Sequence, residues 1–194
     1  MRILIALMGV VFSTSAFAHT GLGDASGFAH GFMHPVGGVD HVLAMVAVGV
    51  LAFVLGGKAR FTVPLSFMAA MLAGGALGIS GFELPLVEAG IGASIIVIAG
   101  LAAFGATLPL GLTSVLVAFF GLFHGFAHGT EMPVDALGIA YAAGFFVATG
   151  LLHLTGFAAG FSMANLFGNK GRLAARIGSG AMALAGVAVL IGAI

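Results

Sequence analysis

The sequence predicts an all-α, polytopic membrane protein: a bundle of six transmembrane helices that follows an N-terminal signal peptide. Mean hydropathy is +1.24, and 61% of the 194 residues are hydrophobic whereas only 6% are charged. So few charged side chains cannot cover a folded domain with a solvated surface. Long apolar runs also recur along the chain, each near the roughly 20 residues that a spanning helix needs. Both observations place the protein in a lipid bilayer.

The composition excludes several kinds of function. The formal net charge is zero, so nothing indicates a nucleic-acid partner. The chain has no cysteine, which excludes disulfides, thiolate catalysis and cysteine-ligated metals. Any metal ligands must therefore come from histidine, aspartate, glutamate, methionine or backbone carbonyls.

Residues 1–18 have the pattern of a secretory signal peptide. Arg2 supplies the positive start, Ile3 to Phe12 forms a short apolar stretch, and Ala18 ends a small-x-small cleavage site. An uncleaved first helix is the alternative, although the apolar stretch is short for a span. Cleavage would make His19 the first residue of the mature chain, outside the cytoplasm.

The rest of the chain divides into an external lead-in, residues 19–34, and one transmembrane domain, residues 35–194. Six apolar runs give the expected spans, which are Pro35 to Gly56, Val63 to Gly81, Pro85 to Ala106, Pro109 to His128, Val134 to Phe161 and Ile177 to Ile194. Glycine recurs every four residues at Gly121, Gly125 and Gly129, a spacing that lets helix backbones approach closely. We therefore expect a compact bundle.

The charged residues predict the orientation in the cytoplasmic (inner) membrane. Cytoplasmic loops are the basic ones. After the signal peptide, all basic side chains fall in two connections, as Lys58, Arg60, Lys170, Arg172 and Arg176. These connections are therefore expected in the cytoplasm and both ends of the mature chain outside. The acidic residues other than Asp40 belong to the external side, as Asp24, Glu83, Glu88, Glu131 and Asp135.

A polar stretch, His34 to His41, opens the first expected span. Pro35 suits a first helical position and disfavours helical dihedrals in His34, which we expect at the helix entrance. Asp40 and His41 then lie one to two turns inside the external face, with Met45 on the same helix face as His41. An ionised aspartate at that depth costs on the order of 3 kcal/mol unless it is compensated. The compensation must come from a protonated histidine, a bound cation or protonation of Asp40, because no lysine or arginine is expected on that side.

A second polar stretch ends the fourth expected span. His124 and His128 are four residues apart and share a helix face, and Glu131 follows within reach. This helix runs outward, so its histidines reach the same face of the membrane as the first stretch. Imidazoles and carboxylates together suit Ni²⁺, Co²⁺, Zn²⁺ or Cu²⁺ better than Mg²⁺ or Ca²⁺. The sequence therefore predicts a metal site, with a structural histidine pair as the alternative.

Other residues are weaker candidates. If the signal peptide is removed, His19 could chelate a metal through its imidazole and its α-amino group, and His30 could assist. His153 lies deep in the fifth span, where a role in the ion pathway and a hydrogen bond to a neighbour are equally open. Met45 fits core packing better than metal ligation.

The two stretches resemble the signature motifs of the HupE/UreJ family of small membrane proteins. The matching residues are His34-Pro-Val-Gly-Gly-Val-Asp40-His41, with Met45 and Gly49 downstream, and His124-Gly-Phe-Ala-His128-Gly-Thr-Glu131. The similarity covers essentially the whole chain. Members are regarded as nickel or cobalt permeases associated with metalloenzyme maturation. The resemblance implies metal contacts at His34, Asp40, His41, His124, His128 and Glu131.

We therefore expect a secondary transporter, not an enzyme, that moves Ni²⁺ or Co²⁺ into the cell. No phosphate-binding Gly-x-x-x-x-Gly-Lys-Ser/Thr motif is present, so direct ATP drive by this chain is not expected. Two alternatives use the same residues. One is a membrane-embedded zinc hydrolase, for which no His-Glu-x-x-His helix is present. The other is haem ligation by histidines on facing helices.

Overall fold

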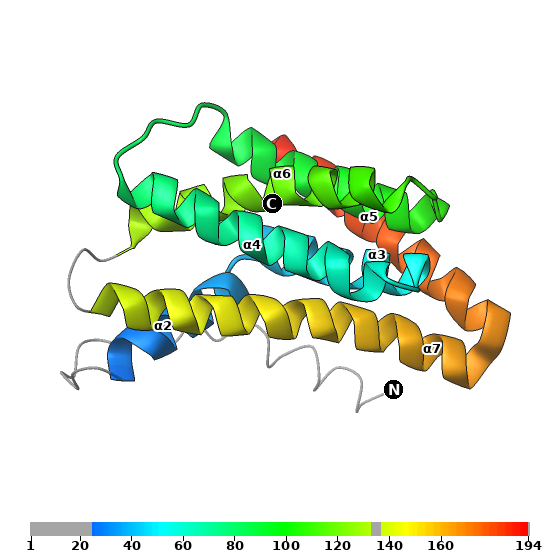
Figure 1. The fold of residues 1–194 in the computed structure, drawn as a ribbon. Helices are drawn as coiled ribbons and strands as arrows, with labels where there is room; N and C mark the ends of the chain where they lie inside the picture. Colours follow the sequence, from blue (N-terminus) through cyan, green and yellow to red (C-terminus); the bar gives the residue numbers. More distant parts are fainter. Residues whose placement is uncertain (1–24, 133–136, 194) are drawn as a thin grey trace, which may run out of the picture.

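The computed structural model describes residues 25–132 and 137–193, and in these ranges it contains helices and no strand (Figure 1). The helices are α2 (Ala25–Gly37), α3 (Val39–Leu55), α4 (Ala59–Ile79), α5 (Val87–Phe104), α6 (Leu110–Glu131) and α7 (Leu137–Leu190). The all-α fold class is therefore confirmed. The expected signal peptide, residues 1–18, and the cleavage-dependent role of His19 lie outside the described residues.

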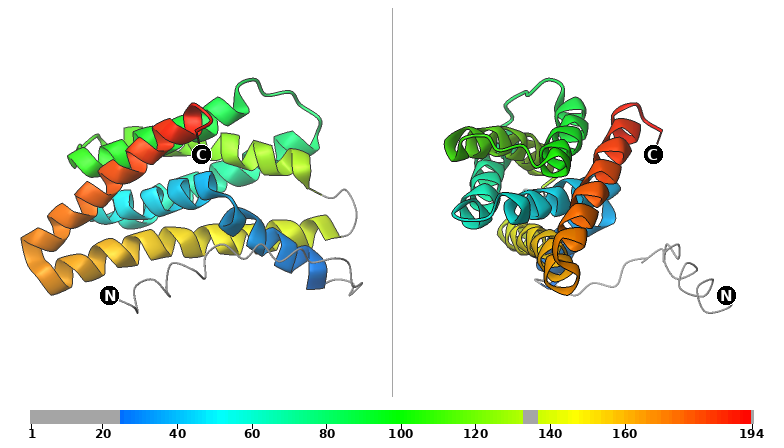
Figure 2. Two further views of the ribbon diagram at one scale, coloured as in Figure 1. Left: turned by 180° about the vertical axis from the view of Figure 1, so that it is seen from behind. Right: turned by 90° about the vertical axis from the view of Figure 1, so that its right-hand side faces the viewer.

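Within the described ranges, 4 helices, α4 to α7, are long and apolar enough to cross a bilayer, and α2 with α3 makes a fifth candidate bent by 82°. Helix α7 has 54 residues, which in a straight helix would extend about 80 Å, far beyond the roughly 30 Å hydrocarbon core. The chain instead reverses at Gly168, with φ 56° and ψ −129°, a conformation that glycine adopts readily. Figure 2 shows the second arm of α7, residues 169–190, running back along the bundle.

The start of the first span differs from the sequence-based expectation. Pro35 does not open the first span: it lies in the last turn of the separate helix α2, and α3 begins at Val39 after an extended Gly38. Residues 25–34 of the expected lead-in are therefore helical, and His34 lies within a helix and not at its entrance. The proline ring and the glycines that follow it favour a sharp break at this point.

Close backbone contact explains why the Gly-rich segment is helical. A Cβ at Gly31 in α2 would collide with the carbonyl of Tyr141 in α7, and a Cβ at Gly144 in α7 would collide with the carbonyl of Phe28 in α2. The glycines therefore let the two helices lie directly against each other, as the blue and yellow segments of Figure 1 do. The packing against α7 stabilises a helix that propensity alone disfavours.

Close backbone contact at glycines also joins α4 to α6, as the glycine spacing predicts. A Cβ at Gly125 or Gly129 of α6 would collide with the backbone of α4 at Met71 or Gly75. From the other side, a Cβ at Gly74 of α4 would collide with the backbone of α6 at Leu122. The close approach of these two helices sets the position of the histidines in the last turns of α6.

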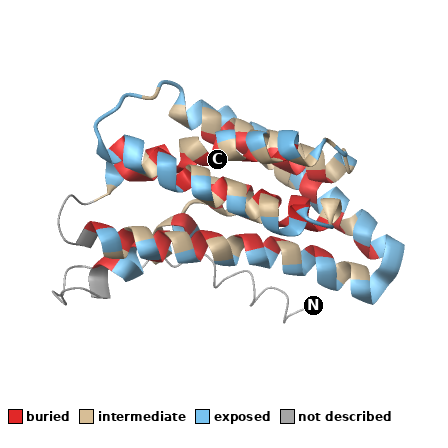
Figure 3. Cartoon of the chain, viewed as in Figure 1, coloured by how far each residue is buried: buried red, intermediate tan, exposed pale blue. Residues whose placement is uncertain are grey.

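The outer surface of the bundle is apolar, as a bilayer requires. Figure 3 shows buried residues on the inward faces of the helices and exposed residues on the outward faces. Large hydrophobic side chains are among the exposed ones, including Phe104 at 81%, Ile139 at 84% and Leu184 at 74% exposure. Such a surface is stable against lipid and not against water. The protein is therefore a multi-pass membrane protein.

The two ends of the bundle differ in charge. The α3–α4 connection with Lys58, the first turn of α4 with Arg60 and the turn of α7 at Gly168 lie at one end. The α4–α5 connection with Glu83 and the end of α6 with Glu131 lie at the other (Figure 1). At the basic end, Arg176 donates hydrogen bonds to the carbonyl oxygens of Ala103 and Phe104, at 2.8 and 2.6 Å, and so satisfies the last turn of α5.

Candidate metal site

The acidic end of the bundle brings the two polar stretches together. Helix α2 contributes one imidazole, the first turn of α3 an aspartate and an imidazole, and the last turns of α6 two imidazoles and a glutamate. We refer to these six side chains as the outer cluster, which consists of His34, Asp40, His41, His124, His128 and Glu131. All of them were predicted from the sequence, and the structure places all of them at this end.

A contact between α3 and α6 forms the centre of the outer cluster. The Nε2 atoms of His41 and His128 lie 2.6 Å apart, although the residues are 87 positions apart in the chain. Asp40 Oδ1 lies 3.0 Å from His41 Nδ1, so the carboxylate accepts the Nδ1–H bond and leaves Nε2 of His41 free to face His128. A carboxylate behind an imidazole in this way orients metal-ligating histidines in many proteins. Two nitrogens bound to one ion at about 2.0–2.1 Å would lie roughly 3 Å apart, close to the separation seen here.

A second carboxylate lies on the other side of His128. Glu131 Oε2 is 3.2 Å from His34 Nε2 and 3.8 Å from His128 Nδ1. One ligand atom from each of these three residues lies within 4.8 Å of the others, a spacing that a single ion could bridge. His128 is therefore shared: one ring nitrogen faces His41 and the other faces Glu131.

His124 lies deeper in the bundle than His128 and is fully buried. Its Nε2 is 2.9 Å from Ser94 Oγ, and Ser94 donates its own hydroxyl proton to the carbonyl of Ile91 at 2.6 Å. Ser94 must therefore accept the Nε2–H of His124, which leaves Nδ1 of His124 as a free acceptor. This Nδ1 has no hydrogen-bond partner among the described residues. The ring lies 4.9 Å from that of His41, so His124 can extend the cluster inward.

A polar cavity of 520 Å³ leads from the acidic end of the bundle to the outer cluster. Since a water molecule occupies about 30 Å³, it can admit a hydrated ion. Two further ionisable side chains, His30 of α2 and Glu88 of α5, line it. From the sequence, His30 was expected only to assist a metal chelate at His19.

Two polar residues of α5 were missed in the sequence-based selection. Glu88 was assigned only to the external side, and Ser94 was not singled out. A lone carboxylate and a lone hydroxyl in an otherwise apolar helix were the signals that could have identified them.

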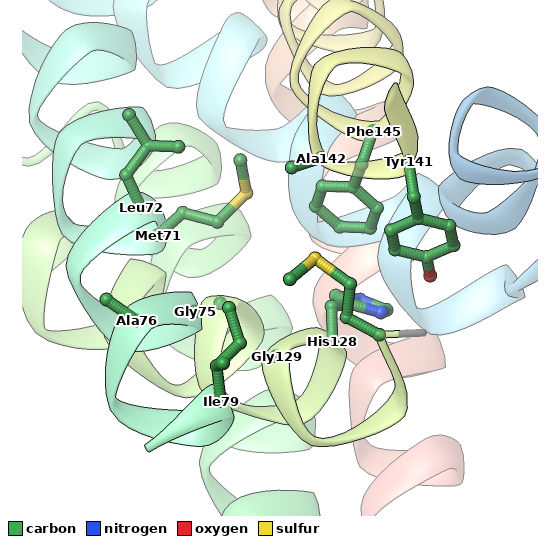
Figure 4. Close-up of a pocket in the computed structure, with 12 residues that line it drawn as sticks. Met71, Leu72, Gly75, Ala76, Ile79, His128, Gly129, Tyr141, Ala142 and Phe145 are labelled. Atoms are coloured by element: carbon green, nitrogen blue, oxygen red, sulfur yellow. The ribbon is translucent and has the colours of Figure 1, made fainter. Parts of the chain in front are cut away.

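The face of His128 directed toward α4 and α7 is apolar. Its ring packs 4.2 Å from that of Phe145, and a pocket of 180 Å³ lies beside it. Figure 4 shows Met71 and Leu72 on one side of this pocket and Tyr141 and Phe145 on the other. The imidazole therefore separates the apolar pocket from the polar cavity, and the packing holds the orientation of the ring.

Two weaker candidates are not part of the outer cluster. Met45 is fully buried in the apolar core, which agrees with a packing role. His153 of α7 is 3% exposed, and neither ring nitrogen has a hydrogen-bond partner in the described parts of the chain. No neighbour satisfies it, although an unpartnered buried polar group costs roughly 1–3 kcal/mol.

An apolar helical bundle with clustered imidazoles and carboxylates at one end defines a polytopic membrane protein with a candidate metal site. Comparison with known proteins identifies the family. The model of the HupE / UreJ protein family matches residues 5–189. The chain is also 42% identical over 192 residues to Protein HupE of Rhizobium leguminosarum bv. viciae, and the match covers 98% of each chain. No solved structure matches significantly.

This chain therefore belongs to the HupE/UreJ family, as the resemblance of its two motifs predicts. The family is one of membrane transporters of nickel and cobalt. Membership accordingly supports a metal permease and agrees with a non-enzymatic role.

Proposed function

We propose that this protein is a permease that moves Ni²⁺ or Co²⁺ through the inner membrane into the cytoplasm, where the ion serves metalloenzyme maturation. The observation that carries the proposal is the contact between His41 and His128 at the end of a polar cavity, with Asp40 behind His41. Neutral imidazoles backed by carboxylates favour a divalent transition metal. Zn²⁺ fits the same ligands and is the main competitor.

The charge balance of the outer cluster supports a cation as its ligand. Among the described residues, the basic side chains belong to the α3–α4 connection, to the first turn of α4 and to α7 from Lys170 to Arg176, at the opposite end of the bundle. Asp40 is only 28% exposed and has His41 as its neighbour. An arriving cation would therefore supply the missing positive charge, while Glu88 and Glu131 raise the local cation concentration in the cavity.

The shared position of His128 suggests an order of binding. The ion first meets His34 and Glu131, which are the more exposed pair, at 31% and 59%. It then passes to the more buried side of His128, where His41 and His124 offer further nitrogens. Each transfer replaces one imidazole by another, so no step leaves the ion without ligands.

Metal uptake into proteoliposomes tests the proposal. We expect the wild-type protein to accumulate Ni²⁺ or Co²⁺, and His41→Ala to lose this activity, because it removes the imidazole between Asp40 and His128. Competition with Zn²⁺ and Mg²⁺ measures the ion preference. The matched control is Thr130→Val, since among the described residues the Thr130 hydroxyl bonds only to the carbonyl of Ala127 in its own helix. Uptake that is indifferent to His41→Ala would contradict the proposal.

A further inference from the structure

His153 is a buried imidazole that the outer cluster does not use. It is 3% exposed, and both of its ring nitrogens lack a hydrogen-bond partner within the described ranges. Buried polar groups are nearly always paired, so an unpaired one in a native fold calls for an explanation such as a bound ion or a functional role. The imidazole therefore retains its full capacity to bind a ligand.

The ring of His153 borders a second cleft, of 380 Å³, on the half of the bundle nearer the basic end. The cleft lies between α4 and α7, and its lining residues include Arg60, Met68, Gly150 and Phe157. Gly150 precedes His153 by about one turn, and a Cβ at this position would lie 3.4 Å from Cε and 3.9 Å from Sδ of Met68. A thioether and an imidazole thus share the cleft, and both are ligands for late transition metals.

A single aromatic ring connects this cleft with the outer cluster. Phe67 is fully buried, and its ring centroid lies 5.3 Å from that of His124 and 5.3 Å from that of His153. His124 is the innermost imidazole of the outer cluster. His153 is therefore the next imidazole toward the basic end, and the ring of Phe67 separates it from His124.

We propose that His153, together with the thioether of Met68, is an inner binding site for the divalent cation that the protein transports. This inference rests on the proposed permease function. The site has one imidazole and no carboxylate among its lining residues, and the guanidinium of Arg60 shares the cleft. It therefore binds a cation more weakly than the outer cluster, which suits a position from which the ion leaves for the cytoplasm.

The first experiment compares His153→Leu with the wild-type protein. We expect Ni²⁺ uptake into proteoliposomes to fall about tenfold or more, while Ni²⁺ binding to the detergent-solubilised protein at the outer cluster is unchanged. The melting temperature should be retained or raised, because the substitution removes an unpaired buried polar group. Thr155→Val is the matched control on the exposed face of the same helix, where the hydroxyl bonds only to the carbonyl of Leu151. Wild-type uptake by His153→Leu would overturn the inner site.

The second experiment uses the absence of cysteine from the chain. His153→Cys places the only thiol at the proposed site, and thiolate is itself a metal ligand. We expect uptake above that of His153→Leu, and we expect Ni²⁺ to slow alkylation of the thiol by a small maleimide. A purely structural role predicts neither result, so alkylation that is indifferent to Ni²⁺ counts against the site.

These experiments separate the two proposals. If the wild-type protein shows no uptake, the permease function fails, and the alkylation assay still tests metal binding at position 153. If the wild-type protein transports and His41→Ala does not, while His153→Leu transports normally, the inner site alone fails.

Discussion

The outer cluster and the His153 cleft use the same type of ligand in opposite electrostatic settings. In the outer cluster, Asp40 and Glu131 lie next to imidazoles at 3.0 and 3.2 Å. The His153 cleft has no carboxylate in its lining and contains Arg60. We therefore expect a cation to be held more strongly at one end of the bundle than toward the other. The charge around the histidines, more than their number, would set how tightly each region holds a cation.

The two regions also differ in how their imidazoles are oriented. Asp40 orients His41 and Ser94 orients His124, so in each ring one nitrogen is occupied and the other is left for a ligand. His153 has no such partner among the described residues. The outer imidazoles are accordingly preorganised for binding, and the inner one is not.

The largest expected effect comes from His128→Ala, because this ring faces both His41 and Glu131. We expect uptake of Ni²⁺ to fall by about 100-fold or more and binding to be lost, whereas His153→Leu leaves binding intact. Isothermal titration together with uptake measures both quantities, with Thr130→Val as the control. Retained high-affinity binding in His128→Ala would remove the distinction between the two regions.

Asp40→Asn is expected to have the next largest effect on Ni²⁺ binding. It keeps the size of the side chain but removes the negative charge that orients His41 and balances the cation, so affinity should fall about 10- to 100-fold. Titration of Ni²⁺ binding checks this. Glu83→Gln is the control for charge alone, since Glu83 belongs to the α4–α5 connection and does not line the polar cavity. Equal losses in the two variants would argue for general electrostatic attraction instead of a defined site.

Ser94→Ala tests the orientation of His124. The substitution leaves the Nε2–H of a fully buried imidazole without its acceptor, which costs roughly 1–3 kcal/mol of stability and should weaken metal affinity about tenfold. Thermal unfolding and titration measure the two effects. Ser80→Ala is the control, because the Ser80 hydroxyl bonds only to the carbonyl of Leu77 in its own helix. Unchanged affinity would show that His124 is not a ligand.

Arg60→Gln should have the smallest effect. Removing the guanidinium from the His153 cleft reduces repulsion of a cation there, so binding at the inner site should strengthen by a few-fold at most, because charges near the surface are screened. Protection of His153→Cys from alkylation measures this in the double variant. Lys58→Gln, at the same end but outside the cleft lining, is the control. Stronger protection in Lys58→Gln than in Arg60→Gln would contradict the role given to Arg60.

Local sequence patterns predicted most of the helices and failed where packing between helices determines whether a segment is helical. The spans that became α4, α5 and α6 were predicted to within a few residues because each is one apolar run between Gly- or Pro-rich connections. Helix α2 was missed because its glycines look like a linker in the sequence, whereas its packing against α7, at Gly31 and at Gly144, stabilises it. The sequence did predict two spans joined by a basic connection in the region of α7, but hydropathy does not locate the reversal at Gly168.

Local properties of the sequence, namely hydropathy, helical spacing and the basic connections, predict a helical membrane protein with imidazoles and carboxylates near one face. It is the folded bundle that brings His41 to His128, places Ser94 beside His124 and leaves His153 apart beyond Phe67. Each of these contacts joins two different helices, so it depends on how closely helices pack, as they do at the glycines between α4 and α6. Such distances arise between segments far apart in the chain, so no local pattern specifies them.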